Sequence, residues 1–444
     1  MLAPGSEFTA TIEKPVAGGR MLTRHEGQVV LVAGAIPGER VRARVIEVAR
    51  GVAYAAAVDV IEAHPARRMP LDAETWLDGP CGGNVYHHID YGHQLSLKKA
   101  VVIDAFSRIG RLDPSTVAEP LAMVASPERG YRMRARLHLR RGRIGFFCEG
   151  THRLCDPAST GQLLPVSLEV ITRVAVAIGQ AEGRDGHQPG GRARSQPLEG
   201  EIELTENVEA SERVLHFSLD RKLSLAELRA MTRVEGLTGF TTSVAGVHGA
   251  GVVIADPHVR DELRVIVGRT IQLRRHVRSF FQGNRFLLNR LVAEVLARVP
   301  DGPVIDLYAG VGVFGVALAA SGRTPVIAVE VDAFSVQDLK QNAAGVSGFQ
   351  IVTGTVEDYL QSPPELASPT VVVDPPRTGL SKAVAAGLVG LEPRRIVYVS
   401  CDVATVARDA RILTEAGYQL KELMGFDLFP NTAHVETVMV MDRA

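Results

Sequence analysis

The chain has 444 residues, of which 46% are hydrophobic and 22% charged, a length that predicts two or three domains and a composition typical of a soluble globular protein. Its net charge of −1 excludes a general electrostatic attraction to nucleic acid, and its four cysteines are too few for a disulfide scaffold. The sequence does not open on a secretory signal, and its long apolar stretch at 304–320 contains an aspartate and three glycines, so we expect a cytoplasmic protein without a membrane span.

Residues 1–66 predict a small antiparallel β-barrel of the OB type. Strand-like segments alternate there with turns at Gly18-Gly19, Gly34 and Pro37-Gly38, which is typical of small barrels. The segment 32–45, VAGAIPGERVRARV, resembles the TRAM domain, and this resemblance implies an RNA-binding module.

Residues 67–275 predict a mixed α+β middle region. A helix near 94–110 is expected to pack on the C-terminal domain, and a second helix covers about 165–181. A polar surface loop is expected to follow at 182–200, because that stretch is rich in glycine, arginine and proline.

An arginine-rich strand is the most distinctive feature of the middle region. Seven arginines lie between Arg129 and Arg143. Period-two alternation puts apolar residues on one face of this strand, and the other face carries Arg132, Arg134, Arg136, His138 and Arg140. A uniformly basic face favours a surface that meets RNA phosphates, and a merely solvated face is the alternative.

Residues 276–444 predict an α/β domain. Short apolar strands alternate with helices along this part of the chain, which indicates a largely parallel sheet covered by helices on both faces. The segment is therefore expected to carry ligand groups where its strands end.

A glycine turn follows the first strand of this domain. Gly310, Gly312 and Gly315 form a G-x-G-x-x-G pattern, and Glu330 follows Gly310 by twenty residues, a distance that suits a nucleotide ribose. Asp306 closes the strand before the turn and favours S-adenosylmethionine over NAD, as in the class I methyltransferase core, which this pattern resembles. A purely structural glycine turn is the alternative.

Two further strand ends carry reactive groups. Asp374 ends one apolar strand and is followed by two prolines, and in class I methyltransferases such a motif often lies beside a planar base. Cys401 ends the next strand and therefore belongs on the same edge of the sheet. A thiolate between a methyl donor and a base suits methylation of uracil carbon 5, because addition to carbon 6 makes carbon 5 nucleophilic. A small buried thiol is the alternative for Cys401.

Glu436 is the candidate general base. It begins the last strand, and if that strand runs antiparallel to its neighbours, its start lies where the parallel strands end. His434 is expected to point to the same side, either as a second polar group of the site or as a solvated neighbour.

Taken together, the motifs resemble the RNA uracil-5-methyltransferase family. SFFQGN, DLYAGVGVFG, DPPRTGL, YVSCD and NTAHVET occur in the order and spacing of that family. The resemblance implies that Cys401 is the nucleophile and Glu436 the base. It also implies an S-adenosylmethionine site lined by Gln282, Tyr308, Glu330 and Asp374, with Asn284 at a helix cap. Arg377 could contact an RNA phosphate or be an ordinary surface arginine.

The chain departs from this family at its cluster cysteines. Many members hold a four-iron cluster through four cysteines, and here Thr75 and Asn84 replace two of them. We therefore expect no iron-sulfur cluster, and Cys81, Cys148 and Cys155 are interpreted as ordinary thiols.

The sequence predicts a monomeric enzyme that methylates a uridine in rRNA or tRNA. Two alternatives stay open: an RNA cytosine-5 methyltransferase, and a non-catalytic RNA-binding protein on a methyltransferase fold.

Overall fold

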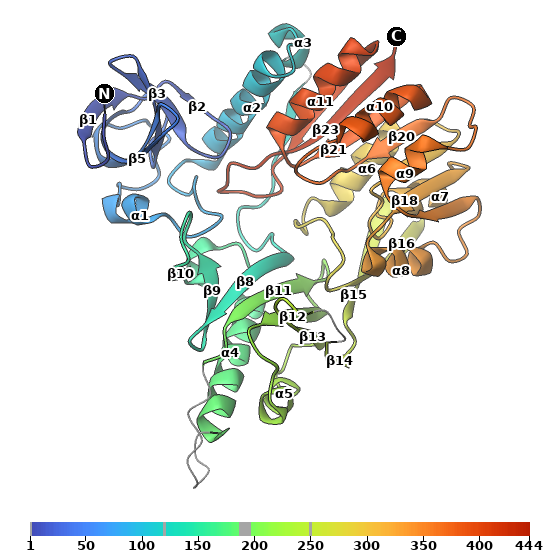
Figure 1. Cartoon of the computed structure of the whole chain (residues 1–444), viewed down its shortest axis with the longest axis horizontal. Coiled ribbons are helices and arrows are strands. Elements are labelled where there is room, and N and C mark those ends of the chain that lie inside the picture. The colour runs from blue at the N-terminus through green and yellow to red at the C-terminus, as the bar shows by residue number, and fades with distance from the viewer. Residues whose placement is uncertain (1, 119–120, 186–196, 248–250) are drawn as a thin grey trace.

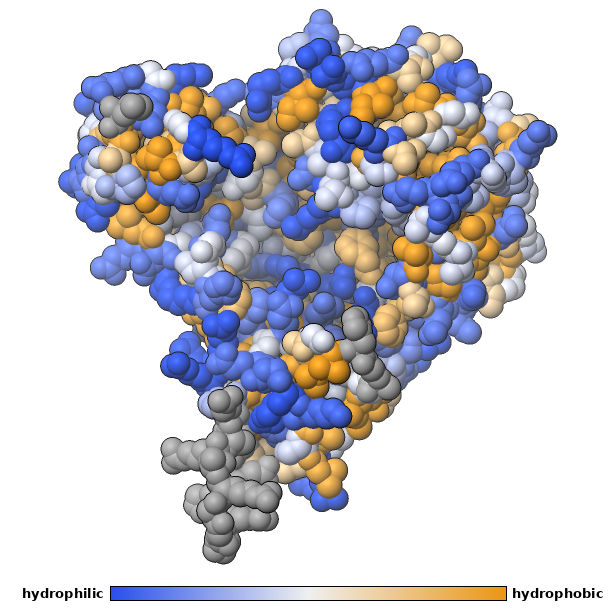
Figure 2. Space-filling view, in the orientation of Figure 1, coloured by the Kyte–Doolittle hydropathy of each residue, from blue (hydrophilic) through white to orange (hydrophobic). Residues whose placement is uncertain are grey.

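The protein folds into three lobes. The structure is a computed structural model that describes residues 2–118, 121–185, 197–247 and 251–444. The N-terminal barrel, the middle sheet and the C-terminal α/β lobe surround a common centre (Figure 1). The space-filling view is hollowed where the lobes meet, and mostly hydrophilic residues surround this hollow (Figure 2). The loop expected at 182–200 lies for the most part outside the described residues.

The N-terminal lobe is a curled six-stranded sheet. Its strands are β1 (Glu7–Thr11), β2 (Lys14–Pro15), β3 (Met21–His25), β4 (Gln28–Ala33), β5 (Arg40–Ala49) and β6 (Val52–Glu62), in the order β1-β5-β6-β4-β3-β2. Strand β5 shows why the sheet curls around a core, because its valines and alanine at 41, 43 and 45 are buried while the arginines between them are exposed.

The segment after the barrel is built into the C-terminal lobe. It contains α1 (Ala73–Asp78), α2 (Tyr91–Arg108), α3 (Pro114–Ala118) and β7 (Ala122–Val124). Helix α2 shares a hydrophobic core with α11, and β7 pairs in parallel with β22 at the edge of the C-terminal sheet. A buried ion pair, Lys98 Nζ to Asp427 Oδ1 at 2.6 Å, also ties α2 to the C-terminal chain. The division expected at 275 therefore does not separate all of the middle region from the C-terminal sheet.

The middle lobe is a seven-stranded sheet with helices on one face. Its strands, in the order β10-β9-β8-β11-β12-β13-β14, are β8 (Arg134–Arg140), β9 (Arg143–Phe147), β10 (Leu154–Cys155), β11 (Gly200–Glu206), β12 (Arg213–Leu219), β13 (Gly239–Val244) and β14 (Val253–Ala255). A 3-10 turn, η1 (Pro157–Thr160), follows β10, and α4 (Pro165–Asp185) and α5 (Leu225–Met231) cover the core. The hairpin β15 (His258–Ile266) and β16 (Arg269–His276) leads into the C-terminal lobe, where Arg274 N–H donates to Asn342 Oδ1 at 2.8 Å.

The C-terminal lobe is a twisted eight-stranded sheet in the order β19-β18-β17-β20-β21-β23-β22-β7. Its strands are β17 (Val304–Leu307), β18 (Val326–Glu330), β19 (Phe349–Thr353), β20 (Thr370–Val373), β21 (Arg395–Ser400), β22 (Tyr418–Phe426) and β23 (Glu436–Arg443). Its helices are α6 (Leu288–Arg298), α7 (Gly315–Ala320), α8 (Ala333–Asn342), α9 (Val356–Gln361), α10 (Lys382–Leu391) and α11 (Val403–Glu415). Strands β17–β21 are parallel and β23 is antiparallel to β21.

Two hydrophobic cores lie on opposite faces of this sheet. One packs α2, α9, α10 and α11 against it, and the other packs α6, α7 and the β15–β16 hairpin. Burial on both faces explains why the central strands are nearly continuous apolar runs. The expected α/β fold, preceded by an OB-like barrel and a mixed middle region, is confirmed. Among the described residues, no helix is long and apolar enough to cross a membrane.

Candidate active site

The predicted nucleophile and base meet at the carboxyl edge of the C-terminal sheet. Cys401 directly follows β21, and Asp374 directly follows the neighbouring parallel strand β20. Strand β23 runs antiparallel to β21 with Ser400 opposite Thr437, so that Glu436 begins β23 beside Cys401. The position expected for Glu436 required β23 to run antiparallel to its neighbour, and the structure shows this direction.

These three residues line one cavity of about 610 Å³. The chain segment before α6 contributes Phe280 and Gln282 to its wall, and the Gln282 amide donates a hydrogen bond to Asp374 Oδ2 at 3.1 Å. Asn284, two residues on, is fully buried and does not line the cavity. Its Oδ1 accepts the N–H groups of Phe286 and Leu287 just before α6.

The arginine strand β8 forms the opposite wall. Arg132, Arg134 and Arg136 line the cavity, and the apolar residues between them are buried, as the alternation predicted. Arg140 lies at the far end of the strand and does not line the cavity; its guanidinium lies 5.1 Å from the centre of the Phe147 ring.

Acidic residues of the neighbouring strand pair with the basic face of β8. Strand β11 lies beside β8, with Glu203 opposite Arg136 and Glu201 opposite His138. Arg134 forms an ion pair with Glu203 at 3.5 Å, and Arg136 forms one with Glu201 at 3.8 Å. Cross-strand pairing of opposite charges stabilises the sheet and lowers its net positive charge. The sequence pattern of β8 alone could not show this, because β11 lies about sixty residues further along the chain.

Burial makes the carboxyl groups of the cavity hard to ionise. It raises the pKa of Asp374 to about 7, and the amide of Gln282 partly opposes this effect. Burial and, secondarily, the charge of Asp374 raise the pKa of Glu436 well above its ordinary value, while Arg377 opposes the shift. A carboxylate with a raised pKa is a stronger proton acceptor, which suits a general base.

The Cys401 thiol is free, and both acidic groups and a cation surround it. Burial raises the pKa of Cys401 to about 11, and the charge of Glu436 adds to this effect. Arg377 acts in the opposite direction, through its positive charge and through a hydrogen bond to the thiol. Cys401 therefore lies between acidic groups that favour the thiol and one cation that favours the thiolate.

The glycine turn lies at the ends of β17 and β18 and outside this cavity. Tyr308 and Gly310 have positive φ values of 61° and 57°, and the Gly310 N–H donates to Glu330 Oε2 at 2.7 Å. A side chain at Gly312 would clash with Leu339 and Val316, so this glycine is required by packing. A side chain at Gly310 would meet open space, which leaves room for a ligand above the turn.

Asp306 lies beneath the turn and is almost fully buried. Its Oδ2 accepts the Gly315 N–H at 2.8 Å, while its Oδ1 has no hydrogen-bond partner within the described ranges. Burial raises the pKa of Asp306 to about 8, and the charges of Asp374 and Glu330 contribute in the same direction. The open turn, the Glu330 carboxylate and the unpartnered oxygen together fit a polar nucleoside ligand such as S-adenosylmethionine.

Sequence reasoning missed two features of the site. Phe280 is 62% exposed at the cavity, with the Arg134 guanidinium 5.6 Å from its ring centre. A second cavity of about 350 Å³ lies on another side of Cys401, and residues of all three lobes line it. His434 lines this second cavity and not the one that holds Glu436, although the two residues were expected on the same side. The reason is that residues 431–435 precede β23 and are not part of a strand, so strand alternation does not apply to His434.

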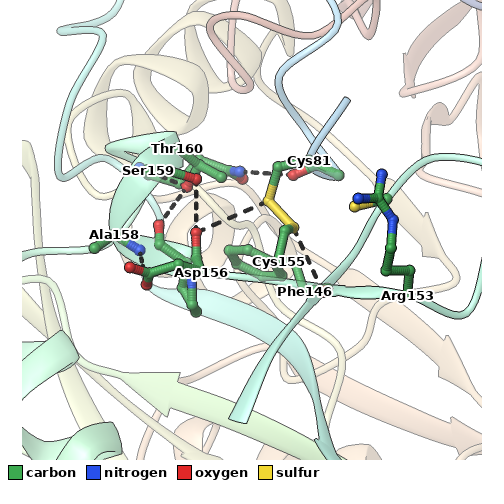
Figure 3. Close-up of a disulfide and its surroundings, with 12 residues drawn as sticks. Cys81, Phe146, Arg153, Cys155, Asp156, Ala158, Ser159 and Thr160 are labelled. Atoms are coloured by element: carbon green, nitrogen blue, oxygen red, sulfur yellow. Dashed lines mark hydrogen bonds between the residues drawn. A yellow bond between two sulfur atoms is a disulfide. The ribbon is translucent and has the colours of Figure 1, made fainter. Parts of the chain in front are cut away.

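The interpretation of Cys81 and Cys155 as ordinary thiols is wrong, because they form a disulfide across 74 residues (Figure 3). Pairing of β10 with β9 places Cys155 opposite Phe146, and the Gly82 N–H donates to the Phe147 carbonyl. Cys148 is a buried free thiol opposite Cys81. A four-thiolate cluster does not fit these residues, and no group of three or more His, Cys, Asp or Glu side chains in the described ranges could hold a metal ion.

The parallel sheet, the glycine turn with its acidic strand ends and the cavity at the carboxyl edge define a class I methyltransferase. A family model described as tRNA (Uracil-5-)-methyltransferase matches residues 219–444, and a TRAM domain model matches residues 2–58. The chain belongs to the tRNA (uracil-5-)-methyltransferase family. It is an S-adenosylmethionine-dependent enzyme that methylates carbon 5 of uracil in RNA.

Known proteins resemble the chain over nearly its whole length. An uncharacterized RNA methyltransferase of Thermosynechococcus vestitus is 30% identical, with 98% of each chain covered. The 23S rRNA (uracil(1939)-C(5))-methyltransferase of Pseudomonas fluorescens is 29% identical, with 99% of this chain and 93% of that protein covered. Among solved structures, the tRNA (uracil-54, C5)-methyltransferase of Pyrococcus abyssi in complex with S-adenosyl-L-homocysteine superposes with a TM-score of 0.74. It is 24% identical, and 98% of this chain and 100% of that chain are covered. This likeness supports the fold of all three lobes.

Proposed function

We propose that the enzyme methylates carbon 5 of a uridine in structured rRNA or tRNA through a covalent bond between Cys401 Sγ and carbon 6, and that Glu436 removes the carbon-5 proton. The observation that carries this proposal is the antiparallel register of β21 and β23, because it brings Cys401 and Glu436 to one cavity. That cavity has room for a flipped base.

The chemistry needs both side chains in turn. The Cys401 thiolate adds to carbon 6, and the electrons of the carbon 5–carbon 6 double bond move onto carbon 5 and the oxygen of the neighbouring carbon-4 carbonyl. When bound, S-adenosylmethionine supplies an electrophilic methyl group to carbon 5. Glu436 then accepts the carbon-5 proton, the double bond forms again, and the bond between Sγ and carbon 6 breaks. The raised pKa of Glu436 favours the last step.

The cofactor site in this proposal spans the ends of three neighbouring strands, β18, β17 and β20. Glu330 and the backbone around Gly310 and Gly312 would hold the nucleoside, with Asp306 supporting the turn from below and Tyr308 beside it. Gln282 and Asp374 would lie between cofactor and base, since the two are hydrogen-bonded to each other and line the cavity that holds Cys401.

The RNA-binding parts in this proposal are the barrel, residues 1–66, and the middle region, residues 67–275, while residues 276–444 carry out the methyl transfer. Arg132, Arg134 and Arg136 would contact phosphates near the target nucleotide, and Arg140 would contact them further along the strand. Every group invoked comes from one chain, which supports action as a monomer, and rRNA and tRNA substrates support a cytoplasmic location.

Cytosine-5 methylation is less well supported. Enzymes of that type usually carry a second cysteine in a Pro-Cys motif, and here Asp374 is followed by Pro-Pro-Arg. The free cysteines in the described chain are Cys148 and Cys401, and Cys148 does not line the cavity.

The proposal is tested with RNA that contains 5-fluorouridine, because its fluorine cannot be removed as a proton and the covalent adduct therefore persists. Intact-protein mass spectrometry with S-adenosylmethionine is expected to find an RNA–protein adduct in the wild type and none in Cys401→Ala. Cys148→Ala is the matched control and is expected to form the adduct. Absence of the adduct from both rRNA and tRNA pools would count against the mechanism. RNA binding and turnover that survive in Cys401→Ala would favour a mechanism without a thiolate.

A further inference from the structure

The arginines that line the cavity from the β8 side have different partners. Arg134 forms an ion pair with Glu203 at 3.5 Å, and Arg136 forms one with Glu201 at 3.8 Å. The hydrogen-bond acceptors of the Arg132 guanidinium are both neutral, and within the described ranges no carboxylate forms an ion pair with it. Among the described residues of this wall, Arg132 therefore carries a positive charge that no glutamate offsets.

A buried glutamine holds both the backbone and the side chain of Arg132. Gln162 is 1% exposed, and its carbonyl accepts the Arg132 backbone N–H at 3.0 Å while its Oε1 accepts Arg132 Nη1 at 2.5 Å. Arg132 Nε donates to the Arg134 carbonyl at 2.9 Å. The ring centres of Phe146 and Phe429 lie 5.6 Å and 5.9 Å from the guanidinium carbon. These hydrogen bonds use Nε and Nη1, so Nη2 stays available to a ligand in the cavity.

The amide of Gln162 does what a carboxylate could not do at this position. Its Nε2 donates to the Gly82 carbonyl at 3.0 Å, and this bond fixes the orientation in which Oε1 points to Arg132. A carboxylate has no N–H to donate, and it would neutralise the arginine. The next residue, Gly83, has a φ of 80°, and a Cβ there would lie 2.6 Å from Gln162 Nε2. The glycine therefore leaves the space that the amide occupies.

We propose that Gln162 is a positioning residue that aims Arg132 into the cavity with its charge uncompensated, so that Arg132 makes a stronger contact with an RNA phosphate beside the target uridine than Arg134 or Arg136 does. A cation that already pairs with a glutamate gains little from a phosphate, whereas a partly buried cation with neutral partners gains the full interaction. This inference rests on the proposed function in placing the target nucleotide in this cavity.

The salt dependence of RNA binding measures this charge directly. Fluorescence anisotropy with a fluorescein-labelled oligouridine of about twelve nucleotides gives Kd between about 50 and 200 mM KCl without any chemical step. In Arg132→Gln we expect binding to weaken by about tenfold and the slope of log Kd against log salt to fall by about 0.7, the value for one phosphate of a single strand. Gln162→Glu should reproduce both changes, because its carboxylate neutralises Arg132. Gln337→Glu adds the same charge on the exposed side of α8, outside the cavity, and is expected to bind like the wild type.

A double-mutant cycle separates positioning from general support of the fold. Gln162→Met removes both side-chain hydrogen bonds of Gln162 and leaves Arg132 charged, so it should weaken binding by about threefold through lost orientation, with the slope retained. In the Arg132→Gln background the same substitution should have no effect on Kd. Equal losses in the two backgrounds would show that Gln162 does not act through Arg132 and would overturn its role.

Glu203→Gln is the reciprocal test, because it releases Arg134 from its ion pair. The slope is expected to rise by about 0.7, as one further phosphate is neutralised. A slope that stays at the wild-type value would contradict the distinction between paired and unpaired arginines.

The remaining outcomes are also decisive. A wild-type slope in Arg132→Gln would overturn the inference even if Kd rises, because Arg132 would then contact an uncharged part of the RNA. If Gln162→Glu shows no cooperative melting transition, Arg132→Gln and the cycle with Gln162→Met decide instead. The expected slopes together with no 5-fluorouridine adduct in the wild type would leave this inference standing while the proposed mechanism fails. An adduct in the wild type with an unchanged slope in Arg132→Gln would have the opposite meaning.

Discussion

At the scale of single residues, opposing charges control the two reactive groups of the site. Burial and acidic neighbours raise the pKa of both Cys401 and Glu436, while the positive charge of Arg377 acts against both shifts. The same surroundings that make Glu436 a strong proton acceptor therefore make Cys401 a weak acid.

Removal of the base is expected to stop the reaction after methyl transfer. In Glu436→Gln the amide keeps the shape of the side chain but cannot accept the carbon-5 proton, so kcat should fall by about 10²- to 10⁴-fold. Unmodified uridine RNA should then stay bound to Cys401, and the mass of the adduct should include the transferred methyl group. The measurement is intact-protein mass spectrometry, with Cys401→Ala/Glu436→Gln as the control that forms no adduct. Loss of turnover without any methylated adduct would show that Glu436 acts at an earlier step.

At the scale of secondary-structure elements, Asp306 joins a strand to a helix. It closes the buried strand β17, and its carboxylate accepts the N–H of Gly315, the first residue of α7. This carboxyl group lies in a core in which its ionised form is poorly solvated, and its pKa is raised from 3.8 to about 8. Its environment therefore links the stability of the sheet edge to pH.

Stability is expected to fall as pH rises, because the folded protein holds the Asp306 proton more tightly than the unfolded chain does. The contribution is complete below the unfolded pKa of 3.8 and is lost as pH rises through about 8. Within that range the loss is at most about 1.4 kcal/mol per pH unit for this one group. Asp306→Asn keeps the bond to Gly315 and removes the titration, so its melting temperature should depend less on pH between about pH 6 and 9. Asp374 adds a slope of the same sign in both proteins. Equal slopes in the two proteins would contradict the assignment.

The same scale shows how much the sequence pattern of one strand can predict. Alternation along β8 correctly separated its buried from its exposed residues. It gave no information on the acidic partners of these arginines, because Glu201 and Glu203 lie on the paired strand β11. The sequence also could not predict the direction of β23. The position of Glu436 was expected only if this strand ran antiparallel, and its pairing with β21 sets that direction.

At the scale of the whole molecule, a disulfide connects the segment that follows the barrel to the middle sheet. The Cys81–Cys155 disulfide links the segment after α1 to β10, and Gly82 and Gly83 beside it line the second cavity at Cys401. The only tryptophan of the chain, Trp76, lies on α1 and is buried against His87 and His88. Its fluorescence therefore reports on whether this segment stays docked.

Reduction of the disulfide is expected to lower the stability of the folded protein. In the chain-entropy model, a cross-link that closes 74 residues contributes about 4 kcal/mol to the free energy of unfolding. Cys81→Ser/Cys155→Ser should unfold at lower urea concentration, and reductant should bring the wild type to the same midpoint, as followed by Trp76 fluorescence. Cys148→Ser is the control, in which the midpoint should still respond to reductant. If alkylation under denaturing, non-reducing conditions labels all four cysteines, the disulfide is absent in solution and this prediction is wrong.

The sequence by itself determined the α/β fold, the glycine turn, the family, and the meeting of Asp374 and Cys401, the proposed nucleophile, at one edge of the sheet. It could do so because residues that end neighbouring parallel strands must meet at one edge of the sheet, and strand ends are visible as local patterns. Only the tertiary structure decided the disulfide across 74 residues, the glutamates that pair with the arginine strand and the place of β7 in the C-terminal sheet. Each of these features joins residues that are far apart in the chain, and no local sequence pattern indicates that they meet. Their contacts are set by the register of the strands and the packing of the lobes.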